Sequence, residues 1–428
     1  MSHRSPIVLA FLLLTGCVVV PAQRAPSRAA GAGELGWAEV MRLKASRDYF
    51  TLRERLRTAR SETPPARFAY ALVQHAFNEP AASNATIATL LDGEALPDSI
   101  VSDLRQIRMA NDLRLSNYPA ALAAANALLA DPASLDAPEL RDVRNMRRVF
   151  EVLAAVPPQT SEARGPSVLQ LDSGRVSMTI NGIPRRYAFD TGANLSTIMR
   201  SEAEALGLRI FPSGIDVGTS TDKRIVADLA VADRLEIGQV RYRNVVFLVL
   251  DDALLTFPDG FRIRAIIGFP VIESLGELHF GANGVLTIPE TPSARSQRNL
   301  ALDGLTPLTP VRWRDQTLLC RLDTGAGTTQ LYEPFYRRNR PAVDSATTLS
   351  TRRMGGAGGV RELAVRPLPT AQLGVGDTTI TLDTVDVLTN SIAREGSENF
   401  LDCNVGHDIL DSFSTYIINF RDMAFLLR

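Results

Sequence analysis

The chain of 428 residues is long enough for several domains and a sizeable buried core, because domains typically span roughly 100–200 residues. Hydrophobic residues make up 45% and charged residues 22%, which excludes intrinsic disorder over most of the length. The 46 basic and 47 acidic residues nearly cancel, so the overall charge gives no reason to expect binding to nucleic acid or to an anionic membrane surface.

The first residues are typical of a secretion signal. His3 and Arg4 precede an apolar run, residues 6–14, that is too short to span a bilayer but has the length of a signal-peptide core. The next residues, Leu14-Thr15-Gly16-Cys17, resemble the bacterial lipobox, in which cleavage before the cysteine and acylation of its thiol tether the mature chain to a membrane. The resemblance implies a signal peptide at residues 1–16, lipidation of Cys17 and an extracytoplasmic location. Val18 favours the periplasmic face of an outer membrane. An ordinary cleaved signal peptide with an incidental cysteine is the alternative.

Residues 17–34 mix proline, glycine, alanine and serine without periodicity, which predicts a flexible tether. From residue 35 to residue 157, apolar residues recur at three- and four-residue steps, which predicts an all-helical domain. Proline breaks should separate helices of about 12 to 18 residues that pair as hairpins. These prolines are Pro64, Pro65, Pro80, Pro97, Pro119 and Pro132. Residues 158–166 read as a linker.

Three turn-like stretches, near Asp48-Tyr49, Ala82-Ser83 and Asn117-Tyr118, lie about 34 residues apart. This spacing resembles that of tetratricopeptide (TPR) repeats, although the signature tryptophan, glycine and proline positions are mostly missing. The resemblance implies a concave surface for a protein partner. A helical cap packed against the rest of the chain, or a regulatory or pro-segment, are the alternatives.

From residue 167 onward, short alternating runs separated by turn pairs such as Asn181-Gly182 predict strands and hairpins. One pattern is repeated: Asp190-Thr191-Gly192-Ala193 recurs as Asp323-Thr324-Gly325-Ala326. Each copy is followed by a further match, ending at Gly268 and Gly406 respectively, and then by a strand-turn-strand pattern. The same β unit therefore occurs twice, in residues 167–292 and 293–428.

Asp-Thr-Gly in two related β lobes resembles the retropepsin and pepsin families of aspartic proteases, in a form where one chain supplies both halves of the retroviral homodimer. The expected fold class is therefore multidomain, with N-terminal all-α, TPR-like hairpins and a C-terminal all-β, double-lobed, retropepsin-like part. A lone triplet would more simply be a β-turn, but matched flanks in two copies argue against that interpretation. Asp172-Ser173-Gly174 is interpreted as such a turn, because it stands between two alternating runs.

The resemblance implies an aspartic endopeptidase whose catalytic dyad is Asp190 and Asp323. Peptide hydrolysis needs a water deprotonated on one side of the carbonyl and an oxygen protonated on the other, and two neighbouring carboxyls that share one proton can do both. No cofactor is implied. Thr191 and Thr324 would hydrogen-bond across the lobe boundary, and the glycine after each lets the backbone turn tightly. A peptide or protein substrate would bind extended in the cleft between the lobes.

Ala193 and Ala326 stand where pepsin-like enzymes usually carry Ser or Thr. A hydroxyl there would stabilise the ionised carboxylate, and alanine removes it. We therefore predict activity at mildly acidic to near-neutral pH.

The glycine-rich run at residues 354–360 resembles the flap tip of retropepsins, with Gly355, Gly356, Gly358 and Gly359 at its centre. A disordered linker is the alternative. In the first lobe only residues 213–214 and 218–220 stand at the corresponding place.

Cys320 and Cys403 each lie three residues before a motif residue, on strands that run side by side in the family's fold. A disulfide and two buried free thiols both remain open. The four histidines, His3, His75, His279 and His407, show no metal-ligand spacing. The rival to the protease is a peptide- or protein-binding lipoprotein without catalytic activity, and Asn404, in a position where the family has an apolar residue, is the departure that favours it.

Overall fold

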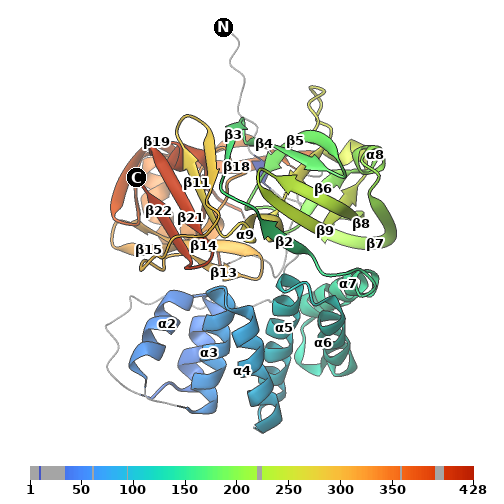
Figure 1. Ribbon diagram of the computed structural model, residues 1–428. Helices are drawn as coiled ribbons and strands as arrows, with labels where there is room; N and C mark the ends of the chain where they lie inside the picture. Colours follow the sequence, from blue (N-terminus) through green and yellow to red (C-terminus); the bar gives the residue numbers. More distant parts are fainter. Residues whose placement is uncertain are drawn as a thin grey trace.

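The computed structural model describes residues 9–10, 34–59, 62–93, 95–218, 224–356, 359–390 and 400–428. Within these residues, helices form the N-terminal part and a large β-rich region follows, as the sequence predicts. In Figure 1 the helices form one layer along one side of two β lobes that lie next to each other. Cys17, almost all of the predicted signal segment and tether, and Gly358 lie outside the described residues.

The helical part is built from hairpins, and the predicted proline breaks all fall at helix starts. Pro64 is the first residue of α3 and Pro80 is the first residue of α4, and Pro119 lies in the first turn of α6. Proline has no helical hydrogen bond to lose at these positions. The helices are α1 (Trp37–Ala45), α2 (Tyr49–Thr58), α3 (Pro64–Ala76), α4 (Pro80–Gly93), α5 (Asp98–Arg114), α6 (Tyr118–Ala130) and α7 (Ala137–Leu153), with a 3-10 turn, η1 (Pro132–Ser134), before α7.

One residue with positive φ closes each of the first three hairpins: Arg47, Asn78 and Ser116. These positions are unevenly spaced, so the expected regular period is not found. The turn expected at Ala82–Ser83 is wrong, because both residues lie inside α4. Ser83 resembled a turn residue, but its hydroxyl donates to Ala71 O of the neighbouring helix at 2.8 Å, which satisfies it in the core.

The helices and the lobes share apolar core. Helices α1 to α5 enclose a small cluster of their own that includes Phe68, Ile87 and Leu104. Leu128 of α6 and Phe150 of α7 instead belong to the large cluster that continues through both lobes. The helical part is therefore packed against the lobes by the hydrophobic effect.

The first β unit begins with two tight hairpins. Ser173-Gly174 and Asn181-Gly182 all have positive φ, as two-residue hairpin turns require, and the expectation for both turns is confirmed. The unit comprises β3 (Ser167–Asp172), β4 (Arg175–Ile180), β5 (Ile183–Phe189), β6 (Ser196–Met199), α8 (Arg200–Ala205), β7 (Arg209–Gly218), β8 (Arg224–Ile237), β9 (Val240–Leu250), η2 (Asp252–Leu255), β10 (Ala265–Ile267), α9 (Phe269–Glu273), β11 (Glu277–Gly281) and β12 (Val285–Ile288), and β2 (Thr160–Ala163) pairs with β9.

The second unit repeats this arrangement. It comprises β13 (Ala301–Asp303), β14 (Thr306–Trp313), β15 (Gln316–Leu322), β16 (Gln330–Leu331), α10 (Glu333–Ala346), β17 (Ser350–Gly356), β18 (Gly359–Val375), β19 (Thr378–Leu388), β20 (Cys403–Val405), α11 (His407–Leu410), β21 (Thr415–Asn419) and β22 (Ala424–Leu427). The closing strands of the two units join, because β11 pairs antiparallel with β21 in the sheet order β22-β21-β11-β12-β3.

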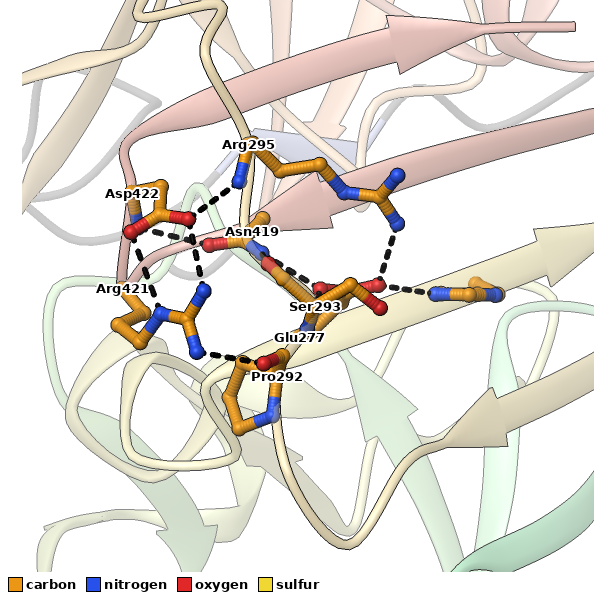
Figure 2. A network of polar contacts seen from close by, with 8 residues as sticks. Glu277, Pro292, Ser293, Arg295, Asn419, Arg421 and Asp422 are labelled. Atoms are coloured by element: carbon orange, nitrogen blue, oxygen red, sulfur yellow. Dashed lines mark hydrogen bonds and ion pairs between the residues drawn. The ribbon is translucent and has the colours of Figure 1, made fainter.

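A buried carboxylate sits at this joint. Glu277 of β11 accepts hydrogen bonds from Arg295 Nη2 (2.8 Å), Ser293 N (2.7 Å) and Asn419 Nδ2 (2.5 Å), and lies 2.5 Å from His279 Nε2. Figure 2 shows how these contacts gather both units and the connecting segment around one side chain. Burial alone would raise the pKa of Glu277, but these donors outweigh burial and lower it to about 2.

Polar contacts hold the helical layer to both lobes. Arg114 of α5 forms an ion pair with Glu273 of the first lobe at 2.7 Å, with the guanidinium almost fully buried. Tyr49 Oη donates to Asp303 of the second lobe at 2.8 Å. Among the described residues, no helix is long and apolar enough to cross a membrane.

Candidate active site

The two Asp-Thr-Gly loops occupy equivalent places in the two lobes. Asp190 follows β5, which runs parallel to β10, and its N–H donates to Ile267 O at 3.0 Å. Asp323 follows β15, which runs parallel to β20, and its N–H donates to Val405 O at 3.2 Å. The repeated sequence is therefore a repeated backbone that presents one carboxyl from each lobe.

The threonines join the two loops. Thr191 Oγ1 donates to Leu322 O at 2.8 Å and accepts from Thr324 N at 3.0 Å. In the same way, Thr324 Oγ1 donates to Phe189 O at 3.3 Å and accepts from Thr191 N at 3.0 Å. These buried bonds run from each lobe to the other, so they fix the spacing of the two carboxyls.

The carboxyls of Asp190 and Asp323 lie together and are buried, at 1% and 0% exposure. Asp190 Oδ1 accepts from Gly192 N at 2.7 Å, and Asp323 Oδ1 accepts from Gly325 N at 3.0 Å. Neither Oδ2 accepts a hydrogen bond from the residues that the structure describes. Burial raises the pKa of Asp190 well above its usual value, and the neighbouring charge of Asp323 raises it further, against the opposing effects of Gly192 N–H and Arg321. Burial and the neighbouring carboxyl therefore both favour a protonated Asp190.

Each glycine of the motif makes room for the opposite carboxyl. A Cβ at Gly192 would lie 2.6 Å from Asp323 Cγ, and a Cβ at Gly325 would lie closer still to the carboxyl of Asp190. We expect Gly192→Ala and Gly325→Ala to displace these carboxyls and to lower kcat/KM by about 10²-fold or more, because small misplacement of reacting groups costs that much. Gly36→Ala, at a glycine with no atom within 4 Å of the added Cβ, is the control. Activity within threefold of the parent in both site variants would contradict this geometry.

The remaining motif residues support the loops. A Cβ at Gly268 would lie 2.7 Å from Ala193 O, and one at Gly406 would lie 2.9 Å from Ala326 O, so both glycines are required by close backbone approach. Ala193 and Ala326 are buried and bring no hydroxyl to the carboxyls. Asn404 is a satisfied polar residue, since its Oδ1 accepts from Gln330 N at 3.1 Å, so it gives no sign of a loosened loop.

A cleft of about 1450 Å³ opens beside the dyad. Asp190, Gly325 and Gly327 line it together with Phe261 of the loop before β10 and Tyr416 of β21. The cleft therefore reaches both lobes and one of the two aspartates.

The predicted glycine-rich flap is a hairpin of β17 and β18, in which Gly356 pairs with Gly359. Gly355 and Gly356 also pair in parallel with the two-residue strand β1 (Leu9–Ala10), which lies within the predicted signal peptide. In the first lobe β7 and β8 form the corresponding hairpin, and its tip, residues 219–223, lies outside the described residues.

Arg321 was missed from the sequence as a residue of the site, whereas His407 was noted there only as a histidine without metal-ligand spacing. Arg321 Nη2 lies 3.3 Å from Asp323 Oδ2, and His407 Nε2 lies 3.0 Å from Thr324 O while its Nδ1 lies 3.0 Å from Asp411 Oδ1. The sequence did contain a sign of Arg321. The flanks of the two motifs differ at this position, where the first motif has Ala188 and the second has an arginine.

Cys320 and Cys403 are register partners on the parallel strands β15 and β20, with Cα atoms 4.5 Å apart, and the structure joins them in a disulfide. We expect a chain lacking Cys17 to show no thiol when it is unfolded without reductant and titrated with Ellman's reagent. Two titrating thiols would exclude the bridge. Among the described residues, no group of three or more His, Cys, Asp or Glu side chains is placed to hold a metal ion.

Comparisons with known proteins match parts of the chain. A family model described as aspartyl protease matches residues 176–271, which include the first Asp-Thr-Gly motif and Gly268. A solved structure similar to part of the chain is a retropepsin-like aspartic protease from Rickettsia conorii, with 16% sequence identity, a TM-score of 0.21, and coverage of 31% of this chain and 95% of that one. No curated protein matches the chain. The family match supports an aspartyl protease fold for residues 176–271.

Proposed function

We propose that this protein is an aspartic endopeptidase in which Asp190 and Asp323 activate a water molecule to hydrolyse peptide bonds. The observation that carries the proposal is that two buried carboxyls from duplicated loops meet beside a cleft, with the pKa of Asp190 raised by burial and by Asp323. A carboxyl such as that of Asp190, which has a perturbed pKa and lines a cleft, is typical of acid–base catalysis. Residues 350–354 of β17, which do not pair with β1, lie at the edge of their sheet, and such an edge favours an extended peptide as the substrate.

The chemistry needs one ionised and one protonated carboxyl. The carboxylate takes a proton from water as the water oxygen attacks the carbonyl carbon, and the carboxylic acid gives its proton to the carbonyl oxygen. The C–N bond of the resulting gem-diol then breaks. The proton taken from water passes to the amine nitrogen, and the other carboxylate recovers a proton from a gem-diol hydroxyl. One water is thereby added across the peptide bond, and the dyad returns to its starting state.

The test is digestion of a peptide library and of a denatured protein by the chain without Cys17, with the fragments mapped by mass spectrometry. The double variant Asp190→Asn/Asp323→Asn is the matched control, since it keeps the shape of both side chains. Cleavage by the parent alone supports the proposal, and the fragment ends report specificity. Tight peptide binding by both proteins, with no cleavage by either, would favour the non-catalytic binding protein.

The activity should depend on pH through the shared proton. Below the acid limb both carboxyls are protonated and no base is present; above the raised pKa of Asp190 both are ionised and no acid is present. The Oδ1 atom of each aspartate accepts one backbone N–H, and Ala193 and Ala326 add no hydroxyl. We therefore expect a bell-shaped profile of kcat/KM against pH, with its maximum at mildly acidic to near-neutral pH. A kcat/KM profile that peaks only below about pH 3 would contradict this expectation.

We also propose that Cys17 carries a lipid that anchors the mature chain to the periplasmic face of an outer membrane. The lipobox resemblance of residues 14–17 supports this. Cells fed an alkyne fatty acid should label the parent and not Cys17→Ser, and equal labelling of both would overturn the proposal. A protein partner for the helical part stays a prediction.

A further inference from the structure

A buried arginine lies beside one of the two carboxyls of the dyad. Arg321 is two residues before Asp323 on β15, its side chain is 4% exposed, and its Nη2 is 3.3 Å from Asp323 Oδ2. Arg321 Nη2 also donates to Tyr332 Oη at 3.4 Å. A cation at this distance from a buried carboxyl is screened little by solvent, so it favours the ionised carboxylate strongly.

The first lobe has no arginine at the equivalent position. Ala188 stands at the position equivalent to Arg321, and it pairs with Ile266 where Arg321 pairs with Asn404. Among the described residues, no cation forms an ion pair with Asp190. The backbones of the two loops are nearly symmetric, but the charges around them are not.

The groups around Arg321 and the two carboxyls determine on which carboxyl a single proton will lie. Among the described residues, the titratable side chains whose contacts with this cluster are known are Asp190, Asp323, Tyr332 and the His407–Asp411 pair, whose His407 reaches the carbonyl oxygen of Thr324. A carboxylate at Asp323 is stabilised by Arg321, and its charge then opposes ionisation of Asp190. The favoured state therefore has the charge on Asp323 and the proton on Asp190.

We propose that Arg321 is a positioning residue that keeps Asp323 ionised and confines the shared proton to Asp190. The catalytic consequence of this inference rests on the proposed function. It is that the two aspartates have different roles. Asp323 takes the proton from the attacking water, and Asp190 gives its proton to the carbonyl oxygen. Arg321 touches neither reacting atom and acts through Asp323.

The test measures the ionisation of each carboxyl directly, so it does not depend on activity. The parent is labelled with 13C at the aspartate carboxyls, and the two resonances are assigned by their loss in Asp190→Asn and Asp323→Asn. In the parent, we expect Asp323 to ionise at lower pH than Asp190. Asp323 ionising last, or both carboxyls titrating together, would overturn the proposal without any further variant.

Variants of Arg321 isolate the charge. Arg321→Met keeps most of the length and removes the charge, and it should narrow the difference between the pH values at which the two carboxyls ionise. Arg321→Lys keeps the charge and should restore most of the parent behaviour. Arg312→Met, which removes an exposed arginine of the adjacent strand β14, is the control and should move nothing.

Activity supplies a second readout. In Arg321→Met the acid limb of kcat/KM should move to higher pH, whereas a merely structural role would lower activity at every pH and leave the limbs in place. An unshifted titration and an unshifted profile in a folded Arg321→Met would refute the role of Arg321. If no chain cleaves any peptide but the titrations behave as expected, the proposed function fails and the assignment of the proton stands.

Discussion

Asp190→Asn and Asp323→Asn are each expected to lower kcat/KM by at least about 10³-fold, because each change removes the acid or the base on which the whole reaction depends. Asparagine keeps the shape of the side chain but can neither accept the proton of water nor donate one to the carbonyl oxygen. The two losses should not add, since either substitution already disables the dyad as a unit.

The fold should survive these substitutions. Both carboxyls are buried beside each other, so replacing one removes a repulsion when the other is ionised. The unfolding midpoint of Asp190→Asn in urea should therefore stay at or above that of the parent. Asp323→Asn also removes the partner of the buried Arg321, so its midpoint should be lower than that of Asp190→Asn. Asp172→Asn is a matched control, because it alters the exposed Asp-Ser-Gly turn and leaves the dyad intact. Activity within tenfold of the parent in either dyad variant would contradict the assignment.

Glu277→Gln should have the largest effect on stability, a loss of about 3–5 kcal/mol in the free energy of unfolding, as is usual when one partner of a buried ionic network is removed. The change leaves Arg295 without its buried carboxylate, and it weakens the contacts from Ser293 and Asn419 that join the two units (Figure 2). Glu290→Gln, an exposed glutamate after β12, should change stability by no more than about 0.5 kcal/mol.

The pH dependence gives Glu277 a second signature. Its pKa is lowered from 4.5 to about 2, so its contribution is fully present above pH 4.5 and is lost as the pH falls toward 2. The parent should lose stability over this window more steeply than Glu277→Gln. Parallel urea-unfolding curves for the two proteins between these pH values would show that the network does not act through the ionised carboxylate.

The sequence was most informative where chemistry dictates residue types. The duplication, the pairing of Asp190 with Asp323 and the closing hairpins could be predicted because the same short pattern recurs with the same flanks. Turns such as Asn181-Gly182 were predictable because few residues adopt positive φ.

Features that depend on tertiary contacts were not predictable. Ser83 was assigned to a turn because a short polar residue suits one, but a neighbouring helix satisfies its hydroxyl. The contact of Arg114 with Glu273 joins residues far apart in the chain. The flank of the second motif contained Arg321, but only the structure shows that its guanidinium lies against Asp323.

The central claim is that a single chain builds one dyad from both of its halves. Its most direct test is the hydrolysis rate of one mapped peptide by the parent, by Asp190→Asn, by Asp323→Asn and by an equimolar mixture of the two variants. We predict that the parent cleaves the peptide and that the mixture stays as inactive as its components, because each chain carries one disabled carboxyl in its own site. Recovery of a substantial fraction of the parent rate in the mixture would contradict the account, since the two carboxyls would then come from different chains.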